Sequence, residues 1–129
     1  MTITKKILIV EDELPLMKAL TEKFQQAQFT VLQASDGQSG LAVALKENPE
    51  MILLDILMPN MDGLEMLEKL RKDKKGKSIP VILLTNLGDM EYISQSVKLG
   101  ISGYLVKSDW TLEEIVQKVK EKLIKKEIL

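Results

Sequence analysis

Five short apolar runs, spaced almost evenly along the chain, constrain the fold more than any other feature of the sequence. They start 22 to 29 residues apart, and each is followed by a longer segment in which apolar residues recur every three or four positions. Such alternation is typical of repeated strand–helix units. Four runs are almost continuously apolar, as expected for strands buried on both faces of a parallel sheet, and we place the second at an edge. The runs are Ile7–Val10, Phe29–Ala34, Met51–Leu54, Pro80–Leu84 and Gly103–Val106.

The segments between these runs carry helix signals. Pro15 suits the first turn of a helix. Met90, Ile93 and Val97 predict the apolar stripe of a fourth helix, which Gly100 ends. Before the last apolar stripe, Thr111 and Glu114 have the spacing of a capping box. Five strands alternating with five helices predict a doubly wound α/β fold with a parallel sheet. The length predicts a single domain over residues 1–129.

Composition removes several classes of chemistry. The chain has no cysteine and no histidine, which excludes disulfides, thiolate nucleophiles, serine–histidine catalysis and histidine- or cysteine-ligated metals. A net charge of −1 and an aromatic content of 4% predict neither direct nucleic-acid binding nor a membrane-surface partner. The longest apolar run is too short to cross a bilayer and the N-terminus lacks a signal-peptide core, so we expect a cytoplasmic protein.

Five polar residues stand at the ends of four of the apolar runs. Glu11 and Asp12 follow the first run, Asp55 the third, Thr85 the fourth and Lys107 the fifth. Because the carboxyl ends of parallel strands share one edge of a sheet, where ligands bind, these side chains should converge there. Taken singly, each has an ordinary explanation, since Asp and Thr cap helices and an isolated Lys is usually at the surface. Together they define a candidate site.

Three carboxylates at one sheet edge need a compensating charge. At separations of roughly 4–6 Å they repel each other by several kcal/mol at an effective dielectric constant of about 20. With no histidine or cysteine present, an all-oxygen site favours a hard cation, and Mg²⁺ fits because it takes one or two carboxylates and retains waters. An Asp nucleophile beside a metal, a Lys and a hydroxyl is also an arrangement that holds a phosphoryl group.

These residues resemble a known family, the receiver domain of response regulators in two-component systems, including its single-domain chemotaxis regulators. The resemblance covers the whole chain in order and spacing. It implies a flavodoxin-like fold with strand order 2-1-3-4-5 and no output domain in this chain. The matching segments are Val10-Glu11-Asp12-Glu13, Leu54-Asp55-x-x-Met58-Pro59-x-Met61-Asp62-Gly63, Leu84-Thr85 and Gly103-Tyr104-Leu105-Val106-Lys107.

The resemblance implies a role for each residue at the sheet edge. Asp55 would accept a phosphoryl group from the phosphohistidine of a histidine kinase or phosphotransfer protein. Asp12 and Asp55 would bind Mg²⁺ together with the backbone carbonyl of Leu57, and Glu11 would act through a water. Lys107 would pair with the phosphoryl group.

The resemblance also implies a switch. The Thr85 hydroxyl would move to meet the phosphoryl group and Tyr104 would swing inward behind it, a local charge change that biases a two-state element. The surface of the fourth helix, fifth strand and fifth helix would then change its affinity for a downstream protein or for a second copy of the chain. Pro59 and Gly63 would shape the loop after Asp55 through turn chemistry.

Several positions depart from the family pattern. Ser108 stands where the family usually has a proline joined to the lysine by a cis bond. A cis bond before a non-proline residue costs about 2.5–4 kcal/mol, so we predict a trans Lys107–Ser108 bond and a rearranged loop through Trp110. Asn86 replaces a small residue and either crowds the phosphoryl site or donates a hydrogen bond to it.

Two apolar residues bear on the lifetime of the phosphorylated form. Leu57 and Leu87 occupy positions that often tune hydrolysis in the family. An apolar side chain cannot orient an attacking water. These residues therefore predict a long-lived phosphoaspartate.

Other functions on this fold compete with the switch. A pseudo-receiver, acting as a phosphorylation-independent interaction module, would lack the acceptor, the metal pair or the lysine, and this chain keeps all of them. A phosphatase of the haloacid-dehalogenase type needs a second Asp where Leu57 stands. A flavodoxin needs a hydroxyl- and glycine-rich loop where Glu11-Asp12-Glu13 would repel a flavin phosphate. We therefore expect no enzyme activity beyond autocatalytic phosphoryl transfer to Asp55 and slow self-dephosphorylation.

Overall fold

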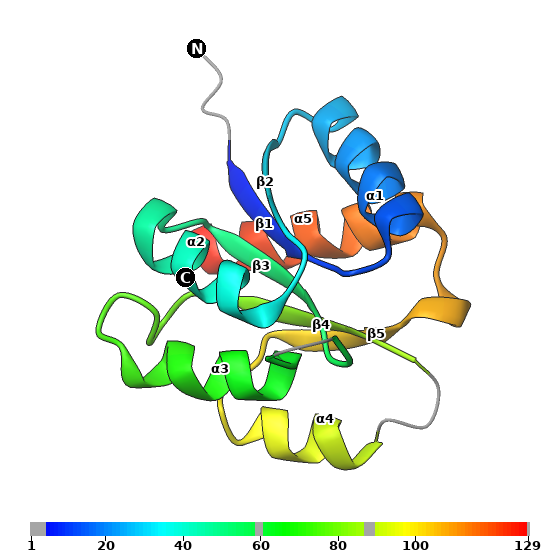
Figure 1. The fold of residues 1–129 in the computed structure, drawn as a ribbon. Coiled ribbons are helices and arrows are strands. Elements are labelled where there is room, and N and C mark those ends of the chain that lie inside the picture. The colour runs from blue at the N-terminus through cyan, green and yellow to red at the C-terminus, as the bar shows by residue number, and fades with distance from the viewer. Residues whose placement is uncertain (1–4, 59–60, 87–89, 129) are drawn as a thin grey trace.

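Strands and helices alternate along the chain in a computed structural model that describes residues 5–58, 61–86 and 90–128. Within these residues there are five strands, five α-helices and one turn of 3₁₀ helix (Figure 1). In chain order they are β1 (Lys6–Val10), α1 (Leu14–Gln26), β2 (Thr30–Ala34), α2 (Gly37–Glu47), β3 (Met51–Asp55), α3 (Gly63–Lys72), β4 (Val81–Thr85), α4 (Met90–Val97), β5 (Gly103–Val106), η1 (Lys107–Asp109) and α5 (Leu112–Ile128).

The strands form one parallel sheet in the order β2-β1-β3-β4-β5, which confirms the predicted fold class and strand order. As predicted, the second strand is at an edge. Predicted and observed strand limits differ by at most one residue at either end, and Asp55 and Thr85 are the last residues of β3 and β4. Phe29 precedes β2 and packs edge-on against Phe24, with ring centroids 5.2 Å apart.

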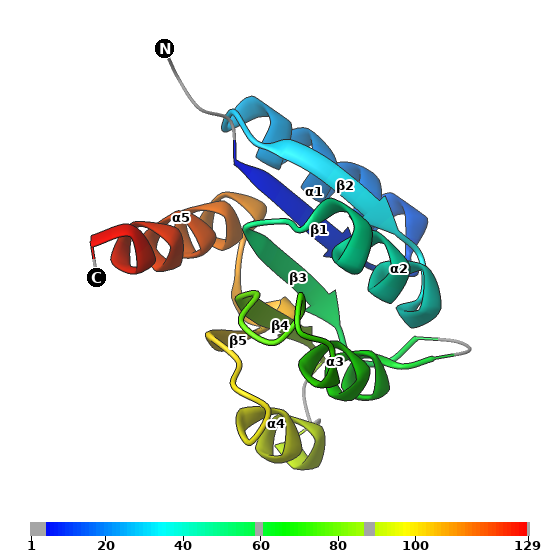
Figure 2. The ribbon, with the colours of Figure 1, turned by 90° about the vertical axis from the view of Figure 1, so that its left-hand side faces the viewer.

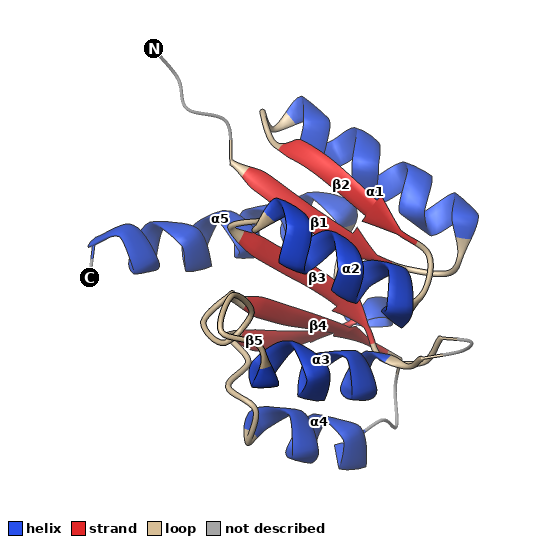
Figure 3. Cartoon of the chain, turned by 60° about the vertical axis from the view of Figure 1, so that its left-hand side comes forward, coloured by secondary structure: helices blue, strands red, loops and turns tan. Residues whose placement is uncertain are grey.

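Helices cover both faces of the sheet (Figures 2 and 3). α1 and α5 pack on one face, and α2, α3 and α4 pack on the other. Alternate residues of β1 divide between the two cores: Ile7 and Ile9 pack toward α1 and α5, and Leu8 and Val10 toward α2 and α3. Because a central strand contributes to both cores, its sequence is apolar throughout. No helix of the described residues combines the length and apolar character needed to span a bilayer.

Two helix signals had different outcomes. The capping box is confirmed, because the Thr111 N–H donates to Glu114 Oε1 at 2.8 Å and the Glu114 N–H donates to Thr111 Oγ1 at 3.1 Å. On α4 the expected apolar stripe is wrong at one position: Val97 is 58% exposed, while Ser96 is buried. The Ser96 hydroxyl donates to the Tyr92 carbonyl at 2.8 Å. A serine that satisfies its hydroxyl within its own helix can occupy the inner face.

α2 and α3 start in close contact with the chain around β3. The N–H of Gly37 donates to the Met61 carbonyl at 3.1 Å, and a Cβ at Gly37 would overlap that oxygen. A Cβ at Gly63 would overlap the carbonyl oxygen of Asp55. Gly63 therefore shapes the loop after Asp55 by letting α3 pack against β3, and not through the turn chemistry that we expected.

One arginine side chain joins α3 to the end of α4. In Arg71, Nε donates to the Leu99 carbonyl at 2.7 Å, Nη1 to the Gly76 carbonyl at 2.7 Å and Nη2 to the Gly100 carbonyl at 3.0 Å. The planar guanidinium can satisfy three carbonyl groups at once because its donors are fixed in a fork. Burial lowers the pKa of Arg71, which stays charged in proteins. This contact fixes the end of α4 and the α3–β4 loop to α3.

Candidate functional site: an acidic pocket with one lysine

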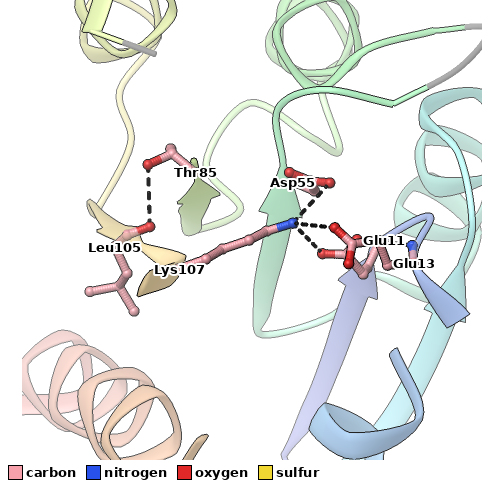
Figure 4. Close-up of polar contacts among 6 residues, drawn as sticks. All are labelled: Glu11, Glu13, Asp55, Thr85, Leu105 and Lys107. Carbon is pink, nitrogen blue, oxygen red and sulfur yellow. Dashed lines mark hydrogen bonds and ion pairs between the residues drawn. The ribbon is translucent and has the colours of Figure 1, made fainter. Parts of the chain in front are cut away.

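Four strand ends bring the predicted site residues to one edge of the sheet. Glu11 follows β1, Asp55 and Thr85 end β3 and β4, and Lys107 follows β5 as the first residue of η1. The Lys107 side chain extends along this edge toward Asp55 and Glu11 (Figure 4). The convergence that the strand ends predicted is present in the structure for the three carboxylates and the lysine.

The carboxylates form a compact acidic pocket. Oxygen atoms of Glu11, Asp12 and Asp55 all lie within 4.8 Å of one another. Glu11 and Asp55 are only 1% and 3% exposed, and Asp55 Oδ1 accepts no hydrogen bond from any described residue. A buried carboxylate oxygen without a donor is costly, and hard oxygen ligands at this spacing suit Mg²⁺. The residues present therefore fit a divalent cation.

Lys107 supplies positive charge to the pocket. Its Nζ lies 3.1 Å from Glu11 Oε1, 3.4 Å from Asp55 Oδ2 and 3.6 Å from Glu13 Oε1 (Figure 4). Lys107 is only 15% exposed and its partners Glu11 and Asp55 are buried, so solvent screens these two ion pairs weakly. One ammonium faces three carboxylates, and Asp12 adds a fourth acidic group beside it. The pocket therefore keeps a net negative charge that favours cation binding.

This charge balance changes the ionisation of both central groups. Burial, then the charge of Glu11, raises the pKa of Asp55 to about 7, with a smaller contribution from Asp12, and the attraction of Lys107 offsets only part of that rise. Burial alone would lower the pKa of Lys107, but the carboxylates of Asp55 and Glu11 outweigh it and raise that pKa. Perturbed groups of this kind, in a pocket, are typical of functional sites.

The two predicted switch residues lie on neighbouring strands. Thr85 is buried, and its Oγ1 donates to the Leu105 carbonyl at 3.4 Å (Figure 4). That distance is long for a hydroxyl donor, for which about 2.7–2.8 Å is usual, so the bond holds the hydroxyl weakly. Losing this hydrogen bond would therefore cost the Thr85 hydroxyl little. Tyr104 in β5 is exposed.

Glu13 is a site residue that the strand-end argument missed. It stands two positions beyond the first acidic residue, and its carboxylate reaches Lys107. The run Glu11-Asp12-Glu13 signals unusual acidity. It does not show which of the three side chains turns toward the lysine, because that depends on how the chain enters α1.

The positions that depart from the family pattern lie around the pocket. The Lys107–Ser108 bond is trans, as predicted, and η1 occupies the following loop. Asn86 and Leu57 are exposed. Leu87 and Pro59 lie outside the described residues.

The fold and the pocket together define a doubly wound α/β protein with an acidic cluster at one sheet edge and a lysine opposite its buried aspartate. Residues 7–120 match the response regulator receiver domain, and the chain belongs to that family. Receiver domains of two-component systems are phospho-signalling modules that generally bind Mg²⁺ at such a pocket and interact with histidine kinases or phosphotransfer proteins.

Known proteins of the same size resemble the chain over almost its full length. Sporulation initiation phosphotransferase F from Bacillus subtilis is 34% identical over 119 residues, which cover 92% of this chain and 94% of that protein. The crystal structure of a CheY-like receiver domain from Methanospirillum hungatei is 29% identical, with a TM-score of 0.89 over 97% of this chain and 98% of that one.

Other relatives are longer. The DNA-binding regulator RpaA from Synechocystis is 33% identical over 115 residues, which cover 89% of this chain but 47% of that protein. The chain spans about half, or less, of the transcriptional regulators that it matches. These relatives are response regulators and transcriptional regulators, not metabolic enzymes.

Proposed function

We propose that this chain is a phosphorylation-dependent signalling switch in which Asp55 accepts the phosphoryl group. The observation that carries the proposal is a buried carboxylate, Asp55, that lies 3.4 Å from Lys107 and beside the acidic groups of Glu11 and Asp12. The phosphoryl donor would be a phosphohistidine on a histidine kinase or phosphotransfer protein. Residues 1–129 would form a single receiver domain.

In the proposed reaction an oxygen of ionised Asp55 attacks the phosphorus of the donor phosphohistidine. The P–N bond breaks as the new P–O bond forms, and the imidazole leaves with the bonding pair. Lys107 provides positive charge beside the phosphoryl oxygens. Asp12, Asp55 and the backbone carbonyl of Leu57 would hold Mg²⁺, with Glu11 acting through a water, and the ion would offset the negative charge of the transferring group.

Signalling would follow from the new charge on Asp55. The Thr85 hydroxyl, held by one long hydrogen bond, would leave Leu105 and donate to the phosphoryl group. Tyr104 would then turn inward from its exposed position. The surface of α4, β5 and α5 would bind a downstream protein, or a second copy of this chain, with altered affinity.

The first test is the intact mass after incubation with Mg²⁺ and acetyl phosphate. We expect the wild type to gain one phosphoryl group, Asp55→Asn to gain none, and Asp109→Asn, which removes an exposed carboxylate from η1, to behave as the wild type. Omitting Mg²⁺ should abolish the gain. Trp110, the single tryptophan, provides a fluorescence signal in parallel.

The opposite result would favour the pseudo-receiver. If neither acetyl phosphate nor a phosphorylated kinase labels the wild type, and calorimetry detects no Mg²⁺ binding, the chain is a phosphorylation-independent interaction module. Labelling that persists in Asp55→Asn would instead show that the acceptor is another residue.

The lifetime of the phosphorylated form is a second prediction. The exposed Leu57 side chain cannot hold an attacking water by a hydrogen bond, and the same chemistry applies to Leu87. We expect slow loss of phosphate after the donor is removed, measured by intact mass over time. Leu57→Asn, which introduces a hydrogen-bonding group, should shorten the half-life. A wild-type half-life of seconds would contradict this prediction.

The predictions about partners and location are part of the same proposal. The predicted lack of direct nucleic-acid contact concerns this chain alone, because relatives such as RpaA are described as DNA-binding regulators and are about twice as long. The cytoplasmic location also remains a prediction.

A further inference from the structure

Glu13 is placed where a helix usually begins with a capping side chain, but it does not cap α1. It immediately precedes Leu14, and its carboxylate makes no hydrogen bond to the first turn of that helix among the described residues. The side chain points instead to Lys107, with Oε1 3.6 Å from Nζ (Figure 4). Helix capping therefore does not explain its orientation.

The backbone and the side chain of Glu13 have separate contacts. The Glu13 N–H donates to Glu11 Oε2 at 3.0 Å, which ties the start of α1 to a buried carboxylate. The Glu13 side chain is 62% exposed, whereas Glu11 and Lys107 are 1% and 15% exposed. Glu13 thus forms the solvent-facing side of the group of carboxylates around Lys107.

This position gives Glu13 two effects on an anion that approaches Asp55. Its carboxylate repels the anion at the pocket mouth, and it competes for the ammonium of Lys107, which the anion needs. The competition is modest, because an exposed ion pair is weak. Repulsion between single charges several ångströms apart in a solvated setting amounts to a few-fold in rate, and it grows with the charge of the anion.

We propose that Glu13 is a positioning residue that selects the phosphoryl donor: it disfavours small free anions relative to a phosphohistidine presented by a protein. A protein donor can place a cationic or hydrogen-bonding side chain opposite Glu13, and a small acyl phosphate cannot. The proposal rests on the function proposed above and names the class of donor that this pocket prefers.

Glu13 takes no part in the covalent step. With acetyl phosphate, a P–O bond forms to Asp55 while the P–O bond to the acetyl group breaks, and acetate leaves with the electron pair. No proton is transferred. Glu13 acts through its charge and through Lys107, so its effect should depend on donor charge and on ionic strength.

The test compares phosphorylation rates of Glu13→Gln and wild type at saturating Mg²⁺. With acetyl phosphate, which carries about two negative charges near neutral pH, we expect the variant to react about three- to tenfold faster at low salt. With phosphoramidate, which has a lower net negative charge, the increase in phosphorylation rate caused by Glu13→Gln should be smaller. Both gains should shrink at about 1 M salt, where the Debye length falls to about 3 Å.

Two further variants serve as controls. Glu68→Gln removes the same charge from an exposed position on α3 and should react as the wild type. Glu13→Asp keeps the charge at the pocket mouth but shortens its reach toward Lys107. If repulsion dominates, Glu13→Asp stays close to wild type, and if competition for Lys107 dominates, it resembles Glu13→Gln; either result supports the proposal.

Magnesium affinity provides a readout that does not depend on phosphorylation. Calorimetry should find that Glu13→Gln raises the Mg²⁺ dissociation constant by less than about 100-fold, the upper range for a residue that is not itself a ligand. A larger loss would make Glu13 a metal ligand and overturn the proposal, as would equal rates for Glu13→Gln and Glu68→Gln with acetyl phosphate. If no variant and no wild type gains phosphate from any donor, the proposed function itself fails, which is a distinguishable result.

Discussion

Replacing Asp55 by asparagine is expected to stabilise the metal-free protein by about 2–4 kcal/mol near pH 8 and to change its stability little near pH 4. Burial and the neighbouring carboxylate of Glu11 raise the pKa of Asp55 to about 7, above the ordinary value of 3.8. Charging this carboxyl group therefore costs folded-state stability, and Asn removes the cost while keeping the shape.

The pH dependence follows from the direction of that shift. Below about pH 4, Asp55 is protonated in both states, so folding carries no ionisation penalty. As the pH rises from about 4 to 7, the unfolded chain releases the proton while the folded chain retains it, and stability falls. Above about pH 7 the penalty is complete, and there the difference between wild type and Asp55→Asn should be largest.

Urea unfolding in buffer containing a chelator measures this effect. Asp109→Asn is the matched control, because it neutralises an exposed carboxylate and should change the free energy of unfolding by less than about 0.5 kcal/mol at either pH. Adding Mg²⁺ should stabilise the wild type more than Asp55→Asn, since bound cation compensates the same charge. A stability difference that is the same near pH 4 and pH 8 would contradict the argument.

Arg71→Met is expected to destabilise the protein by about 2–4 kcal/mol. The arginine donates to three carbonyl groups, on Leu99, Gly76 and Gly100. Methionine preserves most of the apolar stem and supplies no donor, so these carbonyls must find water or remain unsatisfied. The stability of Arg71→Lys should lie between that of the wild type and that of Arg71→Met, because one ammonium cannot reproduce the guanidinium fork.

Lys72→Met is the control for this substitution, since Lys72 is exposed on the same helix and loses the same charge. Denaturant midpoints should separate Arg71→Met from Lys72→Met, and amide exchange should locate the loss of protection at the end of α4. Equal midpoints for the two variants would show that the three hydrogen bonds add no net stability.

The fold was predictable because the sheet is covered on both faces. Strands that contribute side chains to both cores are apolar at every position. Runs such as Ile7–Val10 can therefore be recognised in the sequence without knowing which strands lie beside them. The error on α4 has an equally local cause. Periodicity allows both position 96 and position 97 on the inner face, and residue type favoured Val97, but the Ser96 hydroxyl bonds within its own helix and fits there.

The site was predictable only as far as topology determines it. Parallel strands place Glu11, Asp55 and Lys107 at one sheet edge whatever the details of the loops. The contact of Glu13 depends on how the chain enters α1, and the contacts of Arg71 depend on how α4 ends. The spacing of residues along the sequence does not reveal either of these local conformations. The raised pKa of Asp55 likewise needs the burial and the distances that only the folded structure provides.

The glycines at the starts of α2 and α3 separate the position of the Asp55 backbone from the side chains exposed beside it. Gly37 and Gly63 hold the segment after β3 by backbone contacts that no larger residue allows. The exposed side chain of Leu57 in the same segment therefore has little part in fixing the position of Asp55. A substitution at this exposed position should therefore leave the backbone around Asp55 in place, whereas a side chain at Gly37 or Gly63 would displace it.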